Sequence, residues 1–140
     1  MSIVLFFVVI FVLVLVHEFG HFWMAKKTGM RVDEFGIGFP PKVASLKKGE
    51  TEYSFNLLPI GGFVRIYGED PTEVTPDAAP RAFSARPKWA QVLVLLAGVF
   101  MNVVFAWFLF VIALLIGAPA QVEESAASAN ARLVIAEVIE

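Results

Sequence analysis

Two long apolar segments constrain the fold of this 140-residue chain more than any other feature. The first runs from Ile3 to Ala25 and the second from about Trp89 to Ile116. A helix needs about 20 apolar residues to cross a hydrocarbon core of ~30 Å. Hydrophobic residues make up 58% of the chain and charged residues 17%, which is unlike a soluble domain of this length. The sequence therefore predicts an integral membrane protein, mainly α-helical, with two transmembrane helices.

A cleaved signal peptide is the alternative explanation for the first apolar segment. Met1-Ser2 provides no basic n-region, and the apolar run ends in histidines and bulky aromatics rather than in a small-residue cleavage site. We therefore favour a transmembrane helix. The formal net charge of −2 gives no basic surface for nucleic acid, and the lack of cysteine excludes disulfides and thiolate metal sites.

The distribution of basic residues predicts the orientation in the membrane. Ten of the eleven Lys and Arg residues lie between the two spans, and only Arg132 lies outside them. Basic residues are enriched in cytoplasmic loops. We therefore expect a multi-pass protein of the cell inner (plasma) membrane, in which loop 26–88 is cytoplasmic and both termini are extracytoplasmic.

The loop between the spans alternates polar and apolar residues, which is typical of β-strands. We expect a hairpin in which 52–57 is one strand, 59–62 the turn and 63–67 the returning strand. An exposed, proline-rich connector follows, and the tail looks like the first strand of a further domain. The expected organisation is a first transmembrane helix, a cytoplasmic or membrane-re-entrant β loop with its connector, a second transmembrane helix, and a linker with that strand: 1–26, 27–88, 89–117 and 118–140.

The candidate site is the run His17-Glu18-Phe19-Gly20-His21, which lies inside the first apolar segment. Ionisable groups within a span are costly and by default indicate function. Residues i and i+4 share one face of a helix, so both imidazoles can bind one cation. Zn²⁺ accepts histidine nitrogens and activates water, and Glu18 can take the proton of that water and pass it to a leaving amine. Two hydrogen-bonded core histidines are the alternative.

A catalytic zinc site usually has three protein ligands, and this chain has no third His and no Cys. The carboxylates available in the loop carry no motif that singles one out: Asp33, Glu34, Glu69, Asp70 and Asp77. Asn102 is the one polar group at comparable depth in the second span. Gly98, Asn102 and Ala106 recur every four residues, and we prefer close packing of this stripe against the first helix over a direct chemical role.

These motifs resemble the N-terminal part of the bacterial site-2 proteases, which are intramembrane zinc metalloproteases of the regulator-of-sigma-E protease type. The resemblance covers most of the chain and rests on five runs: Val16–Phe22, Phe35–Phe39, Thr51–Tyr53, Leu58–Val64 and Ala97–Asn102. It implies that His17 and His21 bind zinc and that Glu18 is the catalytic acid/base. It also implies that the β loop dips into the membrane beside the site. It further implies that the tail is the first strand of an incomplete PDZ-like domain.

The chain departs from the family pattern in two places. Family members often have proline where Val99 stands. Their third zinc ligand is an aspartate in a later transmembrane helix, so the chain is expected to be truncated before that ligand. The implied activity is cleavage of the transmembrane segments of membrane-anchored regulators, such as anti-sigma factors, or of signal-peptide remnants.

Two alternatives stay open at this point. The hairpin is expected to offer an edge strand to an unwound substrate, through Gly61, Gly62, Phe63 and Val64, but an ordinary cytoplasmic hairpin is also possible. The chain as a whole is alternatively a catalytically incomplete two-span scaffold or subunit that retains a relic metal motif.

Overall fold

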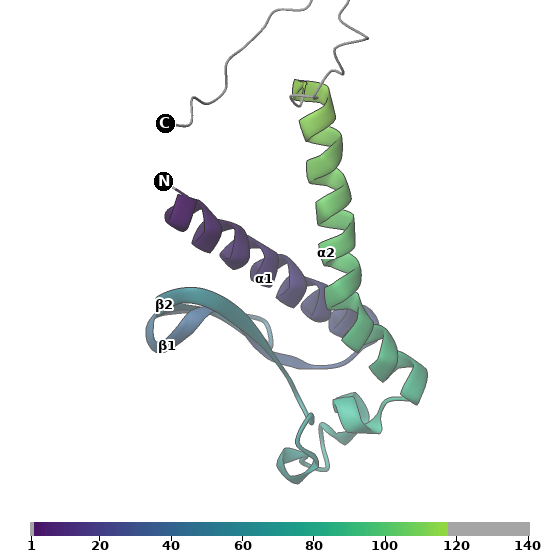
Figure 1. Ribbon diagram of the computed structural model, residues 1–140. Coiled ribbons are helices and arrows are strands. Elements are labelled where there is room, and N and C mark those ends of the chain that lie inside the picture. Colours follow the sequence, from purple (N-terminus) through teal and green to yellow (C-terminus); the bar gives the residue numbers. More distant parts are fainter. Residues whose placement is uncertain (1, 118–140) are drawn as a thin grey trace, which may run out of the picture. The chain divides into compact units, whose positions relative to one another are not determined.

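The computed structural model describes residues 2–117, and the predicted linker and PDZ-like strand lie outside these residues (Figure 1). The described elements are two long helices, two strands and three short 3-10 helices, in the order α1 (Ser2–Lys27), β1 (Val32–Lys48), β2 (Thr51–Ile66), Pro71–Glu73, Ala79–Arg81, Phe83–Ala85 and α2 (Lys88–Ile116). The chain divides into two compact units, Met1–Phe108 and Leu109–Glu140. The first unit holds the hairpin and every site residue discussed below. Of the second, only the end of α2 is described.

Both helices have the length and composition needed to cross a membrane. The qualifying stretches are Ile3–Lys27, with 25 residues, and Lys88–Ile116, with 29 residues. Only 6% of the most apolar window of the first helix and 0% of that of the second are buried inside the protein. So much exposed apolar surface is unfavourable in water. The prediction of two apolar helices with a hairpin between them is therefore confirmed.

The C-terminus of α1 is fixed by local hydrogen bonds that its sequence explains. Gly29 adopts a left-handed conformation with φ +76°, which glycine reaches without strain. Its N–H donates to the carbonyl of Lys26, and the N–H of Met30 donates to that of Ala25. This pattern is a Schellman motif, and the buried contact between Ala25 and Met30 accompanies it. The helix therefore ends at a defined point, and the strand that follows starts at a defined place.

The two strands form one antiparallel sheet in which both strands are bent. The second half of β1 pairs with the start of β2, so that Lys48 lies opposite Thr51. The first half of β1 pairs with the end of β2, where Val32 lies opposite Ile66. Because of the bend, residues 34–37 also lie opposite residues 52–55. Along this second contact the two stretches run in the same direction, from Glu34 opposite Glu52 to Ile37 opposite Phe55. The start of β1 is thus paired along both of its edges.

This sheet corrects the predicted hairpin. Residues 52–57 and 63–66 are both in strand conformation, but they belong to the single strand β2 and each pairs with β1 rather than with the other. The predicted turn at 59–62 lies inside β2, and the actual turn is at Gly49-Glu50. Gly49 has φ +66°, which a turn here requires. Alternation identified the strand residues correctly but carried no information about their partners.

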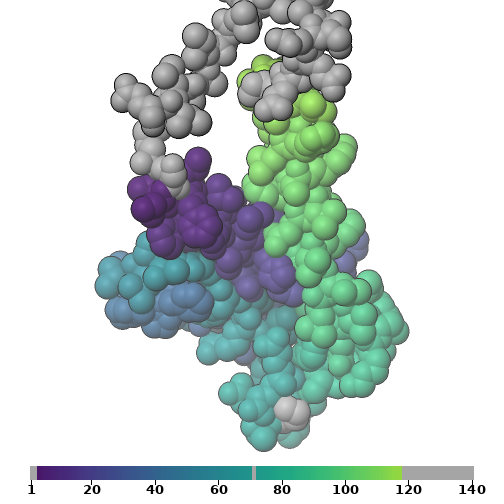
Figure 2. Space-filling model, viewed as in Figure 1, coloured from purple at the N-terminus to yellow at the C-terminus, as the bar shows by residue number. Residues whose placement is uncertain are grey.

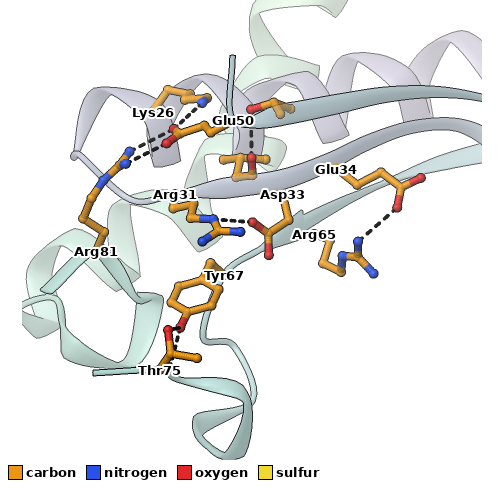
Figure 3. A network of polar contacts seen from close by, with 11 residues as sticks. Lys26, Arg31, Asp33, Glu34, Glu50, Arg65, Tyr67, Thr75 and Arg81 are labelled. Carbon is orange, nitrogen blue, oxygen red and sulfur yellow. Dashed lines mark hydrogen bonds and ion pairs between the residues drawn. The ribbon is translucent and has the colours of Figure 1, made fainter. Parts of the chain in front are cut away.

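Ion pairs hold the hairpin turn against the end of α1 (Figure 3). The Glu50 carboxylate accepts two hydrogen bonds from Arg81, at 2.6 and 2.9 Å, and one from Lys26 at 2.7 Å. These donors hold the pKa of Glu50 at about 2, well below its usual value. The turn and the connector are therefore both fastened to the last turn of α1.

The connector between β2 and α2 is tied to the same region through backbone contacts. The N–H of Arg31 donates to the carbonyl of Arg81, and the N–H of Phe83 donates to that of Tyr67. The Tyr67 hydroxyl lies 3.0 Å from the Thr75 hydroxyl, and the ring stacks under the Arg31 guanidinium. The apolar core beneath these contacts joins α1, both strands and α2: Ala25, Met30, Val32, Ile66, Ala90 and Val94. The starting point of α2 is thereby fixed relative to the end of α1.

The sheet packs along α1, as the blue-to-teal hairpin against the purple helix shows in Figure 2. The Phe22 ring contacts Phe35 and Tyr53, with centroid distances of 5.3 and 6.0 Å. Further along, Gly61 lies against Val14 of α1. The half of the hairpin beyond these contacts exposes large apolar side chains: Phe39, Val43, Phe55, Leu57, Leu58 and Ile60.

Candidate metal centre

The two histidines of α1 converge on one point. The Nε2 atoms of His17 and His21 lie 3.0 Å apart, and the rings meet edge to face with centroids 4.7 Å apart. Two nitrogen ligands that bind one zinc ion at ~2.05 Å stand this far apart when the N–Zn–N angle is about 95°, which a four-coordinate site tolerates. The i, i+4 spacing thus produces a geometry suited to a shared cation.

The ring of His21 is oriented by the second helix. Its Nδ1 lies 2.7 Å from the backbone carbonyl oxygen of Val94 in α2. A carbonyl only accepts, so Nδ1 carries the proton and Nε2 keeps a free lone pair. Histidine ligands of metals typically make this kind of hydrogen bond through their second nitrogen. No sequence pattern indicates Val94, because the acceptor is a backbone atom.

Gly98 of α2 provides the space in front of the two histidines. A Cβ at this position would lie 2.5 Å from Nε2 of His21 and 2.7 Å from Nε2 of His17. Both distances are too short for any side chain, so only glycine leaves this volume free. The free volume lies beside two ring nitrogens that can each serve as a metal ligand, so it fits a metal ion. Gly98 was expected to allow close packing of the two helices. Its position has a further effect, because the missing side chain leaves space beside the Nε2 atoms of both histidines.

Gly20 of α1 packs directly against α2 next to Gly98. A Cβ at Gly20 of α1 would lie 2.8 Å from the backbone carbonyl carbon of Ala97 and 2.9 Å from the Met101 side chain. The backbones of the two helices are therefore in direct contact at Gly20 and Ala97. Gly20, inside the His-Glu-x-x-His run, thus allows this close contact between the helices, because any side chain there would collide with α2.

Asn102 lies on the other side of the pair, next to His17. Its Nδ2 is 3.4 Å from Nδ1 of His17, and its Oδ1 is buried without a hydrogen-bond partner among the described residues. Ala106, the third member of the expected stripe, is exposed, so that part of the packing prediction is wrong. The face of α2 turned towards α1 instead runs through Val94, Gly98 and Asn102.

Glu18 faces a cavity that it shares with His17. This cavity, of about 310 Å³, is lined by Ile10, Leu13, Val14, His17, Glu18 and Asn102. A Cβ at Gly62 of β2 would lie 3.7 Å from Cγ of Glu18, so the strand passes beside this carboxylate. The expected substrate-binding run, 61–64, is thus adjacent to the expected acid/base. Phe63 and Val64 lie opposite Gly36 and Phe35 of β1.

Within residues 2–117, no group of three His, Asp or Glu side chains is placed to hold a metal ion. Several of the acidic candidates have other partners. Asp33 pairs with Arg31 at 2.6 Å, Glu34 pairs with Lys42 at 3.0 Å, and Asp70 accepts hydrogen bonds from Thr72. Glu69 and Asp77 are exposed in the connector.

An apolar helix that carries two convergent histidines and an adjacent glutamate has the arrangement expected of a metallopeptidase site. Comparison with known families agrees, because residues 5–139 match the model of Peptidase family M50. The chain therefore belongs to peptidase family M50, the site-2 protease family, which confirms the resemblance seen in the sequence.

Relatives of the chain carry names of the same kind. The chain is 43% identical over 120 residues to the zinc metalloprotease Rip1 of Mycobacterium tuberculosis, an overlap that covers 84% of this chain and 30% of the relative. It is 55% identical over 73 residues to the zinc metalloprotease RasP of Geobacillus kaustophilus, an overlap of 52% and 17%. The chain thus spans less than a third of the length of these relatives.

Proposed function

We propose that this chain carries the zinc-binding and acid/base residues of an intramembrane zinc metalloendopeptidase. The observation that carries the proposal is the convergence of the His17 and His21 Nε2 atoms on the space left by Gly98, with Glu18 beside them. The substrates would be transmembrane segments of membrane-anchored regulatory proteins, including anti-sigma-factor-like regulators, or signal-peptide remnants. Membership of family M50 and the names of the relatives support a zinc protease.

The residues divide the chemical work as follows. Zinc, when bound, polarises the scissile carbonyl and lowers the pKa of the attacking water. His17 and His21 are its ligands, and the carbonyl of Val94 holds the His21 ring in the required tautomer. Glu18 accepts the proton of the water and returns it to the leaving amine. We propose that a carboxylate outside residues 2–117 supplies the third ligand.

The position of the site along α1 supports cleavage below the membrane surface. Lys26 follows His17 by nine residues, which is about 13 Å at 1.5 Å per residue. Lys27 lies 4.9 Å from the centre of the Trp23 ring. Basic and aromatic residues of this kind mark the interface of a span with water. We propose that loop 26–88 faces the cytoplasm and that the helices span the inner membrane. The metal would then lie within the membrane, below its cytoplasmic surface.

The contacts of the hairpin with α1 support a re-entrant β loop. Its turn is fastened to Lys26 through Glu50, and Gly61 lies against Val14. Twelve residues separate these two levels of α1, which is about 18 Å along the helix axis. Most of the exposed apolar side chains of the hairpin lie on its distal half, where lipid would meet them. Non-helical backbone at such depth must be covered by protein or line a wet cavity.

The end of β2 is the proposed substrate-binding edge. In the described ladder, residues 62–64 pair with β1, and no other strand pairs with them. The opposite edge is therefore available to an extended peptide, which would add to the sheet by main-chain hydrogen bonds. Because Gly62 lies beside Glu18, a peptide at this edge would pass close to the acid/base.

Replacement of Glu18 by Gln tests the enzymatic function. The amide keeps the size of the side chain but cannot take a proton, so Glu18→Gln should abolish cleavage of a membrane-anchored reporter while zinc content is retained. Asp77→Asn, an exposed carboxylate of the connector, is the matched control and should cleave normally.

The competing function is a two-span scaffold or subunit with a relic metal motif. It is favoured by the presence of only two candidate ligands within residues 2–117. Equal processing of the reporter by wild type and Glu18→Gln would support the scaffold and reject the protease.

A further inference from the structure

We infer that Asn102 is a positioning residue for His17, whose Nδ1–H donates a hydrogen bond to the Asn102 Oδ1. This bond would hold the ring of His17 and keep its Nε2 free for a metal ion. The inference rests on the proposed function in one respect, which is that His17 binds metal through Nε2. It replaces the packing role expected for Asn102.

The surroundings of the Asn102 amide provide the first argument. With Nδ2 towards His17, the contact is long, at 3.4 Å, and Oδ1 is buried with no partner among the described residues. An amide has nearly the same shape in both orientations, so its orientation is assigned from hydrogen bonding. A half-turn of the amide brings Oδ1 to the imidazole and gives the buried acceptor its donor. The orientation with Nδ2 towards His17 leaves this oxygen unsatisfied, which buried acceptors rarely tolerate.

The protonation state of a metal-binding histidine provides the second argument. A neutral imidazole that offers Nε2 to a cation carries its proton on Nδ1. The Asn102 NH₂ group would then face another N–H, which is repulsive. Only Oδ1 can accept from this Nδ1–H.

The second histidine provides the third argument. His21 already makes the corresponding bond, from Nδ1 to the carbonyl of Val94 at 2.7 Å. Val94, Gly98 and Asn102 follow one another at intervals of four on α2, so they lie on one face of that helix. Val94 serves His21, Asn102 serves His17, and Gly98 between them leaves the space for the ion. One helix face thus provides an acceptor for each ligand.

Three variants of the full chain in detergent separate positioning from packing. Asn102→Asp keeps an acceptor at the same place, Asn102→Leu keeps a similar volume without an acceptor, and Val103→Ala alters an exposed neighbour as a control. Zinc dissociation constants from competition with a chelator are the first readout. We expect Asn102→Leu to weaken zinc binding about 10–100-fold, with Asn102→Asp and Val103→Ala within a few-fold of wild type. Wild-type affinity in Asn102→Leu, or equal losses in Asn102→Leu and Asn102→Asp, would overturn the inference.

The Nδ1–H proton of His17 is a second readout, measured at saturating zinc. The chain contains only two histidines, so ¹⁵N-histidine labelling gives two assignable rings. With zinc on the Nε2 atoms, we expect both Nδ1–H protons to be protected from exchange with solvent, and that of His17 alone to lose this protection in Asn102→Leu. An unchanged His21 signal shows that the variant is folded, and an unchanged His17 signal would reject the role of Asn102. A wild type that binds zinc but does not cleave the reporter would reject the proposed protease, whereas the exchange measurement would still decide the role of Asn102.

Discussion

Substitution of Gly98 by Ala tests the metal centre most directly. The added Cβ would lie 2.5 Å from Nε2 of His21 and 2.7 Å from Nε2 of His17. A carbon and a nitrogen in van der Waals contact are separated by about 3.3–3.5 Å, so each ring must withdraw by roughly 0.6–1 Å. Zinc–nitrogen bonds tolerate deviations of only ~0.2 Å, so the two histidines can no longer bind one ion together. We expect about a 100-fold loss of zinc affinity, which is the upper end of losses seen for residues that only support ligands.

The assay is zinc affinity of purified protein, with helix content followed by circular dichroism. Alanine favours helix over glycine by about 1 kcal/mol, so helix content should not fall and any loss of zinc reports the clash. Ala106→Val, which enlarges an exposed residue of the same helix, is the control and should bind zinc normally. Wild-type affinity in Gly98→Ala would refute the proposal that the ion occupies the space between Gly98 and the two histidines.

Two further predictions concern the ion pairs of Glu50 and the membrane topology of the loop. The pKa of Glu50 is lowered to about 2, so its ion pairs stabilise the fold above the usual carboxyl pKa of 4.5, and this stability is lost as pH falls from there towards 2. With the solvent exposure of the pair taken into account, we expect about 1 kcal/mol; thermal unfolding of Glu50→Gln should show the loss at pH 7 and little difference from wild type near pH 2. The chain has no cysteine, so single cysteines can be labelled selectively. Asp77→Cys should react with an impermeant reagent only from the cytoplasmic side, Leu57→Cys should resist it, and ready labelling of Leu57→Cys in intact protein would contradict the re-entrant loop.

The sequence was most informative where the determining interactions are local. The two spans follow from apolarity alone, and the convergence of His17 and His21 follows from four-residue spacing on a helix. Strand pairing is non-local, which is why residues 52–57 were assigned to the wrong partner. Alternation identifies a strand equally well whether it pairs with 63–67 or with β1. A tight turn at Gly49 was available as a signal, since glycine after two lysines separates two alternating runs.

The contribution of α2 could be anticipated only in part, and this has a consequence for how such motifs are interpreted. Asn102 stood out as a polar residue in an apolar span, whereas the carbonyl of Val94 leaves no trace in any sequence. The His-Glu-x-x-His run supplies both ligands, but the space for an ion and the orientation of the rings come from the opposing helix. Metal binding therefore depends on the packing of α1 against α2, which the contact between Gly20 and Ala97 permits. A chain with the same run but a side chain at the position of Gly98 would keep the motif and lose the site.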